Sequence, residues 1–162
     1  MKAVILAGGL RTRLTPYTTV LHNPLMPTPR MTMGESPILE IIVKQLKAKG
    51  FNEITLAVGH LSELIMAFFN NGSKYGLKIE YSKEEKKLGT AGGLGLLKNK
   101  LEDDFLVMNG DVLTGLDFSE FLEFHKKTGS IATIALNRRH VDIDFGVVEL
   151  DENRTLIGYI EK

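Results

Sequence analysis

The sequence predicts an α/β fold in which helices flank a mostly parallel sheet. Short apolar runs at 3–7 and 105–108 have the length and composition of strands that are buried on both faces. Between such runs lie segments with apolar residues at helical spacing and with signals for helix ends. Strands that alternate with helices form βαβ units, and a sheet built from these units binds ligands at the carboxyl ends of its strands.

The expected elements follow the same logic along the whole chain. Ser36 and Pro37 indicate a helix that begins with Ser36 as N-cap and ends at Gly50. Asp117 and Glu120 form a capping-box pattern. Four prolines between residues 10 and 35 exclude a long helix there. Further helices are expected at 62–69, 91–98 and 118–127, and strands at 3–7, 53–58, 77–81, 105–108, 131–136, 146–150 and 155–160.

The composition excludes several classes of function. The chain has 162 residues with 20 basic and 20 acidic side chains, so it lacks the basic surplus of a nucleic-acid-binding protein. It has no cysteine, which excludes disulfides and thiol catalysis. No apolar run is long enough to cross a membrane. The apolar stretch at the N-terminus is too short for a secretion signal and favours a cytoplasmic protein.

The loop after the first strand carries the strongest chemical signal. Residues 6–16 read Leu-Ala-Gly-Gly-Leu-Arg-Thr-Arg-Leu-Thr-Pro. Glycines allow the backbone N–H groups to approach a phosphate, and arginine adds a planar donor pair that fits phosphate. Neither a Walker A loop nor the GxGxxG pattern of NAD-dependent enzymes is present. On spacing alone, a surface turn with solvated arginines is equally favoured.

The loop resembles the signature of sugar-phosphate nucleotidylyltransferases, of the mannose-1-phosphate guanylyltransferase and glucose-1-phosphate thymidylyltransferase type. Further similarity follows in the family's order at 24–27, 36–40, 88–92, 109–111, 145–149 and 161–162. The resemblance implies a Rossmann-like fold of the nucleotide-diphospho-sugar transferase type. It also implies that residues 1–162 are the catalytic domain, truncated at its C-terminal side.

The family's nucleotide site maps onto residues from three segments of this chain. The resemblance implies that the nucleotide contacts Leu6, Ala7, Gly8, Gly9, Thr12, Glu84, Gly89 and Thr90. It places Glu84 at the Watson–Crick edge of the base. A carboxylate only accepts hydrogen bonds, and guanine offers two adjacent donors where uracil and thymine offer one, so Glu84 favours GTP. A solvated charge in the run Lys83–Lys87 is the alternative for this side chain.

The resemblance also implies the catalytic and sugar-phosphate residues. Arg13 would stabilise charge on the reacting phosphates, and Asp111 would hold Mg²⁺. An ordinary Asn-Gly-Asp turn is the alternative for Asp111. Gly146, Glu161 and Lys162 fall at the family's sugar-phosphate positions. The implied partners are a nucleoside triphosphate and a sugar 1-phosphate, with neither nucleic acid nor membrane, and a homo-oligomer stays open.

The chain departs from the family near its phosphate loop. Arg11 stands where the family has glycine, and His22 and Asn23 replace a proline and a lysine. The lost lysine removes charge from the phosphates, a type of loss that commonly lowers the rate by about 10²–10³. These changes leave a catalytically impaired regulatory subunit, or an inactive fragment, as the alternative to an active nucleotidylyltransferase. A different α/β nucleotide binder, such as an NAD-dependent enzyme, is disfavoured because the GxGxxG pattern is absent.

Overall fold

A computed structural model describes residues 1–8, 36–59, 62–84, 88–89, 92–140 and 146–160. The chain divides into two compact units, Met1–Gly129 and Ser130–Lys162. The prediction that 1–162 form one catalytic domain stays a prediction.

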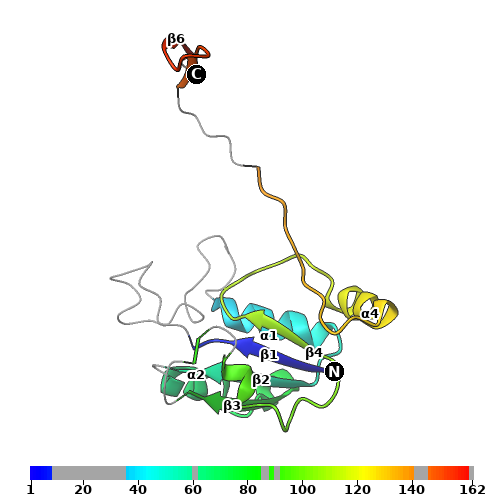
Figure 1. The fold of residues 1–162 in the computed structure, drawn as a ribbon. Coiled ribbons are helices and arrows are strands. Elements are labelled where there is room, and N and C mark those ends of the chain that lie inside the picture. The colour runs from blue at the N-terminus through cyan, green and yellow to red at the C-terminus, as the bar shows by residue number, and fades with distance from the viewer. Residues whose placement is uncertain (9–35, 60–61, 85–87, 90–91, 141–145, 161–162) are drawn as a thin grey trace. The chain divides into compact units, whose positions relative to one another are not determined.

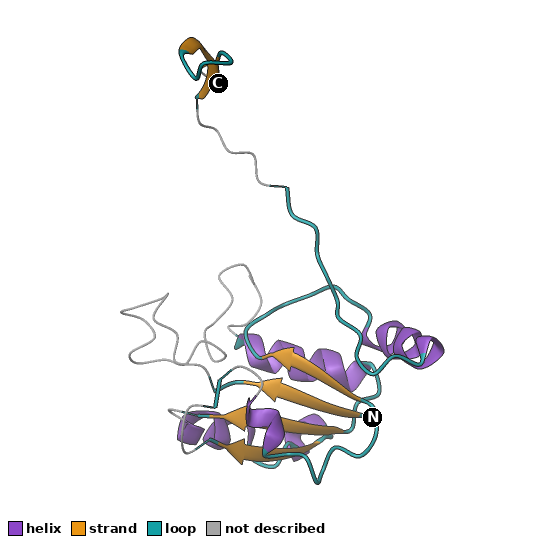
Figure 2. Cartoon of the chain, viewed as in Figure 1, coloured by secondary structure: helices purple, strands orange, loops and turns teal. Residues whose placement is uncertain are grey.

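The first unit contains a four-stranded sheet in the order β3-β2-β1-β4 (Figure 1, Figure 2). Its strands are β1 (Lys2–Leu6), β2 (Glu53–Val58), β3 (Lys78–Lys83) and β4 (Phe105–Asn109). All neighbouring strands are parallel. The chain moves outward from β1 to β3 and then returns to place β4 on the other side of β1. The predicted mostly parallel α/β sheet is therefore confirmed. The strand order reverses between β1 and β4, and in sheets of this type ligands bind at the carboxyl ends of the strands beside such a reversal.

The helices lie where right-handed crossovers require them. Helix α1 (Ile38–Ala48) connects β1 to β2, and α2 (Ser62–Phe69) connects β2 to β3. A short 3₁₀ turn, η3 (Ser73–Tyr75), precedes β3. The four-residue α3 (Gly92–Gly95) lies between β3 and β4, and α4 (Phe118–Thr128) follows β4. Because the step from β3 to β4 reverses direction, α3 lies on the sheet face opposite α1 and α2.

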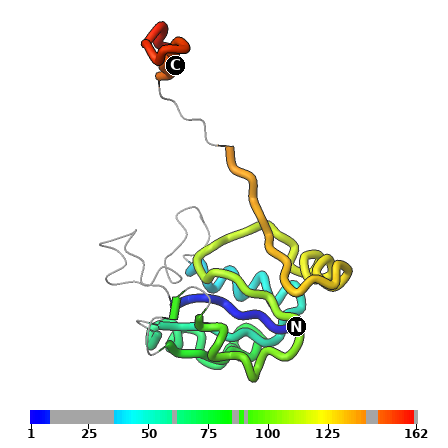
Figure 3. Tube along the Cα trace, viewed as in Figure 1, coloured from blue at the N-terminus to red at the C-terminus, as the bar shows by residue number. Residues whose placement is uncertain are grey.

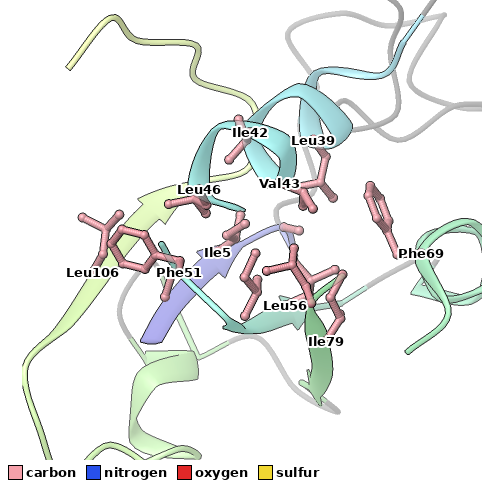
Figure 4. Packing of buried hydrophobic residues seen from close by; sticks show 14 of the residues in the cluster. Ile5, Leu39, Ile42, Val43, Leu46, Phe51, Leu56, Phe69, Ile79 and Leu106 are labelled. Carbon is pink, nitrogen blue, oxygen red and sulfur yellow. The ribbon is translucent and has the colours of Figure 1, made fainter. Parts of the chain in front are cut away.

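The main core fills the face between the sheet and helices α1 and α2 (Figure 4). Alternate residues of β1, among them Ile5, point into it beside Leu56 of β2 and Leu106 of β4. Helix α1 contributes Leu39, Ile42, Val43 and Leu46, all fully buried. The opposite face holds a smaller cluster of Val4, Ala57 and Leu97. The central strand is therefore buried on both faces, as its continuous apolar sequence predicts.

Helix α4 begins and ends at the signals that the sequence contains. The Asp117 carboxylate accepts hydrogen bonds from the backbone N–H groups of Ser119 and Glu120, at 2.9 and 3.3 Å. The helix ends at Gly129, which adopts a left-handed conformation with φ 61°. The ammonium of Lys49, after α1, pairs with the same Asp117 carboxylate and lowers the pKa of that carboxyl. One side chain therefore caps α4 and attaches it to the end of α1.

Three predictions of local structure are wrong. Helix α1 has Pro37 rather than Ser36 as its N-cap, with no side-chain cap hydrogen bond. The helix expected at 91–98 is limited to Gly92–Gly95, because its three glycines favour helix poorly. Residues 131–136 form no strand. The apolar side chains of Ile131, Ile134 and Leu136 are fully or largely exposed.

The second unit contains an antiparallel hairpin of β5 (Val147–Leu150) and β6 (Leu156–Ile160), the red end of the tube in Figure 3. Asp151 organises its turn, because its carboxylate accepts from the backbone N–H groups of Asn153 and Thr155 at 2.9 and 2.7 Å. No side chain among the described residues 130–140 and 146–160 is buried. This unit therefore has no core of its own in the part that the structure describes.

Among the described residues, no helix is long and apolar enough to cross a membrane.

The sharpest stability prediction concerns Gly72, between α2 and η3. Its φ is +82°, and a Cβ there would lie 2.6 Å from Ile79 Cγ1 and 2.9 Å from the Leu77 carbonyl oxygen. We expect Gly72→Ala to destabilise the protein by about 2 kcal/mol or more, because backbone strain and overpacking add. Urea unfolding measures the change.

Gly115→Ala is the matched control. A Cβ at Gly115 would meet no atom within 4 Å, and its backbone is not left-handed. Equal stability of the two variants would contradict the packing described around Gly72.

Candidate functional site

Three predicted site residues and one further glycine lie just beyond the carboxyl ends of the strands, because the strands are in register. Leu6 of β1 pairs with Ala57 of β2 on one side and with Asn109 of β4 on the other, and Ala57 pairs with Ser82 of β3. Two residues beyond this shared row lie Gly8, Gly59, Glu84 and Asp111. Three strand spacings separate the outermost of these, so the row extends over about 14 Å. We call these four residues the strand-end row.

Ala7 and Gly8, at the start of the predicted phosphate loop, pack against the end of β2. The Ala7 N–H donates to the Ala57 carbonyl at 2.8 Å, which extends the β1–β2 pairing by one residue. A Cβ on Gly8 would lie 3.1 Å from the Gly59 nitrogen, and a Cβ on Gly59 would lie 2.7 Å from the Gly8 carbonyl oxygen. The two glycines therefore allow the backbones to approach closely. Sequence reasoning missed Gly59, although a glycine directly after the second strand was a usable signal.

The turn after β4 lies against the same strand. The Gly110 N–H donates to the Leu6 carbonyl at 3.0 Å. A Cβ on Gly110 would lie 3.2 Å from Ile5 Cγ2 and 3.5 Å from Ala7 Cβ. Asp111 therefore follows directly beside the strand that leads into the phosphate loop, and its side chain is half-buried. Asp111 and Gly8 therefore follow the ends of two adjacent, in-register strands, and the role of Asp111 as a metal ligand stays a prediction.

The donor chemistry at Asp111 fits Mg²⁺ as a shared ligand. Among the described residues, no group of three or more His, Asp or Glu side chains could hold a metal ion by itself. Magnesium commonly binds one or two carboxylates and takes its other ligands from phosphates and water. A single Asp111 carboxylate beside a phosphate loop suits that mode of binding.

Glu84 lies at the other end of the strand-end row. Its backbone N–H donates to the Val58 carbonyl at 3.0 Å, which continues the β2–β3 pairing past the end of β3. Its half-buried side chain turns toward α3, where a Cβ on Gly93 would lie 2.5 Å from Glu84 Oε1. The preceding Lys83 pairs with Glu63 of α2 at 2.9 Å and not with Glu84. The sequence places Gly93 in the glycine-rich segment 89–93, expected to lie against the base, but does not indicate its contact with Glu84.

The remaining predicted site residues fall at other positions of the first unit, in the second unit, or outside the described residues. Gly89 is exposed and left-handed, with φ +82°. Gly146 lies in the second unit, where the Tyr159 ring occupies the space that a Cβ would fill. Six further candidates lie outside the described residues, and so do Arg11, His22 and Asn23; the six are Gly9, Thr12, Arg13, Thr90, Glu161 and Lys162.

A cavity of about 360 Å³ lies near the amino ends of the strands. Its lining includes Lys2, Glu53 and Lys78, the first residues of β1, β2 and β3. Glu80 within it pairs with Lys78 at 2.7 Å and with Lys100 at 2.9 Å. Ligands of parallel α/β sheets bind at the carboxyl ends of the strands, so we assign the candidate site to the strand-end row and not to this cavity.

Comparison with known proteins agrees with the fold and the predicted family. A mannose-1-phosphate guanylyltransferase of Mycobacterium tuberculosis is 36% identical over 161 residues, which cover 99% of this chain and 44% of that protein. A UTP--glucose-1-phosphate uridylyltransferase of Synechocystis is 34% identical, and the match covers all of this chain and 44% of that protein. The chain thus spans less than half the length of these curated relatives.

Solved structures show the same similarity. The crystal structure of a protein named as a putative glucose-1-phosphate thymidylyltransferase from Bacillus anthracis, in complex with a sucrose, matches with a TM-score of 0.70 at 28% identity. The match covers 99% of this chain and 64% of that one. The sequence family described as "Nucleotidyl transferase" matches residues 2–162. The chain therefore belongs to the nucleotidyl transferase family.

Proposed function

We propose that this chain is the nucleotide-binding part of a sugar-1-phosphate nucleotidylyltransferase. The reaction joins a nucleoside monophosphate from a nucleoside triphosphate to a sugar 1-phosphate and releases pyrophosphate. One observation supports the proposal: the register of four parallel strands brings Gly8, Asp111 and Glu84 to the carboxyl ends of the strands. A nucleotide lying along that edge would meet a base-reading group at one end and a metal ligand near the other.

The chemistry needs little from the protein beyond position and charge. An oxygen of the sugar 1-phosphate attacks the α-phosphorus, the bond from the α-phosphorus to the bridging oxygen breaks, and pyrophosphate leaves with that electron pair. A phosphate monoester is already ionised near neutral pH, so no general base is required. The N–H groups at Gly8 and Gly9, together with Thr12 and Arg13, hold the phosphates, and Arg13 offsets the charge that develops.

Asp111 holds Mg²⁺ in this proposal. When bound, the ion neutralises charge on the phosphates of the triphosphate. Asp111 is half-buried and directly follows Gly110, which packs against Ile5 and Ala7 of the strand that leads to Gly8; this supports the assignment.

Glu84 reads the base, and it favours guanine. Its carboxylate accepts hydrogen bonds from both N1–H and N2–H of guanine but has only N3–H to accept from in uracil. Leu6, Ala7, Gly89 and Thr90 supply backbone beside the base and ribose. The relatives named as guanylyltransferases support GTP. A relative named for UTP, the Synechocystis uridylyltransferase, is almost as similar to this chain, at 34% identity against 36%.

The sugar 1-phosphate binds Gly146, Glu161 and Lys162. The cytoplasmic location and the homo-oligomer stay predictions. Arg11, His22 and Asn23 favour one second candidate, a nucleotide-sugar-binding regulatory subunit or inactive fragment with impaired catalysis.

Pyrophosphate release with each of the four nucleoside triphosphates and a panel of sugar 1-phosphates distinguishes these functions. Product formation supports the enzyme, and binding of nucleotide sugar without turnover supports the regulatory subunit. Folded chain that binds neither nucleotide nor nucleotide sugar would contradict both.

We expect Asp111→Asn to weaken magnesium-dependent binding of GTP by about tenfold or more, because the substitution removes the charge that attracts the ion. Isothermal titration with and without Mg²⁺ measures the effect. Asp103→Asn is the matched control, since Asp103 lies before the amino end of the same strand, β4. Equal losses in the two variants would contradict the metal assignment.

We expect Arg13→Ala to weaken triphosphate binding by about tenfold or more, because a charge-assisted pair of hydrogen bonds to phosphate is lost. Affinity for GTP, compared with that of guanosine, measures whether the phosphates account for the loss. Arg138→Ala, at an exposed arginine of the second unit, should leave both affinities unchanged. An unchanged affinity of Arg13→Ala for GTP would show that the phosphate site is misplaced.

A further inference from the structure

The Glu84 carboxylate occupies space that exists only because residue 93 has no side chain. A Cβ built on Gly93 would lie 2.5 Å from Glu84 Oε1 and 3.6 Å from Glu84 Cδ. Gly93 itself is buried, in the first turn of α3. Any larger residue at 93 would therefore push the carboxylate out of its present place.

The backbone at Gly93 does not require glycine. Left-handed φ values occur at Gly89 and other glycines, but not at Gly93. Alanine favours helix over glycine by about 1 kcal/mol, so glycine at this helical position lowers local stability. Of the atoms that a Cβ on Gly93 would approach, only Glu84 Oε1 lies closer than 3.0 Å, so Glu84 is the neighbour that a side chain at 93 would displace.

Gly93 is also tied to the part of the sheet that leads into the phosphate loop. A Cβ on Gly93 would lie 3.9 Å from Ala57 Cβ, an ordinary packing distance. The Ala57 carbonyl accepts the Ala7 N–H at 2.8 Å, one residue before Gly8. The first turn of α3 thus lies beside β2, the strand whose Ala57 carbonyl also accepts from the residue before Gly8.

We infer that Gly93 is a positioning residue for base selection: it leaves the space that sets the place of the Glu84 carboxylate, and so sets the preference for guanine over uracil. This inference rests on the proposed function, in which Glu84 reads the base. Gly93 contacts no nucleotide in this account and acts through Glu84.

The test is Gly93→Ala, with GTP and UTP affinities measured by isothermal titration in Mg²⁺. GTP affinity should fall about 10- to 100-fold, because guanine loses two hydrogen bonds to a charged group, while UTP affinity should fall less, because uracil loses only one. The melting temperature should change little, because the displaced atoms are the end of a flexible side chain. Equal losses for GTP and UTP, or an unchanged ratio, would overturn the inference.

Gly95→Ala is the matched control in the same helix. A Cβ at Gly95 would meet no atom within 4 Å. The ratio of GTP to UTP affinity should stay at the wild-type value in this variant. A selectivity loss in Gly95→Ala as large as that in Gly93→Ala would show that helix content, and not the space for Glu84, sets the ratio.

A double-mutant cycle with Glu84→Ala separates this inference from the proposed function. If Glu84→Ala leaves the ratio of GTP to UTP affinity unchanged, base reading by Glu84 is wrong, and the inference is overturned with it. If Glu84→Ala removes the preference, Gly93→Ala should add less than about twofold in that background. A further tenfold loss there would overturn the role of Gly93 while base reading by Glu84 survives.

If Gly93→Ala alone fails to fold, the double variant Gly93→Ala, Glu84→Ala tests whether the contact with Glu84 causes the failure. The double variant lacks the carboxylate that the added methyl group would meet, so it should fold if the contact with Glu84 is the cause. Failure of both variants to fold, measured by circular dichroism, would overturn the inference.

Discussion

The parallel pairing of β1 with β2 on one side and β4 on the other is the constraint on which the site depends. Leu6 is in register with both Ala57 and Asn109, so three strands end at the same level. Each following residue then lies at one edge of the sheet. Gly8 and Gly59 allow the closest approach in this row, and Gly110 allows the next turn to pack against Ala7. A register shift of one residue would move Asp111 away from the phosphate loop.

Local sequence signals predict most of the elements in the first unit, because those elements depend on nearby residues. The helix at Ser62–Phe69 and the Asp117 cap of α4 are confirmed as predicted. The strand expected at 131–136 is wrong, since alternating apolar residues form a strand only with a partner that sequence alone does not identify. The strand order is likewise beyond local signals, because it pairs Leu6 with Asn109, far apart in the chain.

The candidate site could be predicted only in part, because some of its residues are recognisable from their neighbours in sequence and others only from their neighbours in space. Gly8 and Asp111 follow strands in turns whose residue types suit phosphate and metal, but an ordinary turn explains these patterns as well, so it is the resemblance that identifies both residues. Gly59 and Gly93 act through side chains that they lack, and only the atoms around them reveal that role. Glu84 is identified partly from sequence and partly from structure. Its charge is evident from the sequence, but the proximity of its carboxylate to Gly93 of α3 is evident only from the structure.

The most direct test of the account maps the nucleotide onto the sheet. Amide chemical shifts of the isotopically labelled chain, recorded with and without GTP and Mg²⁺, report which residues the ligand affects. The account predicts the largest changes in the strand-end row, at Gly8, Gly59, Glu84 and Asp111. The largest changes at Lys2, Glu53 and Lys78, around the cavity at the amino ends of the strands, would contradict it.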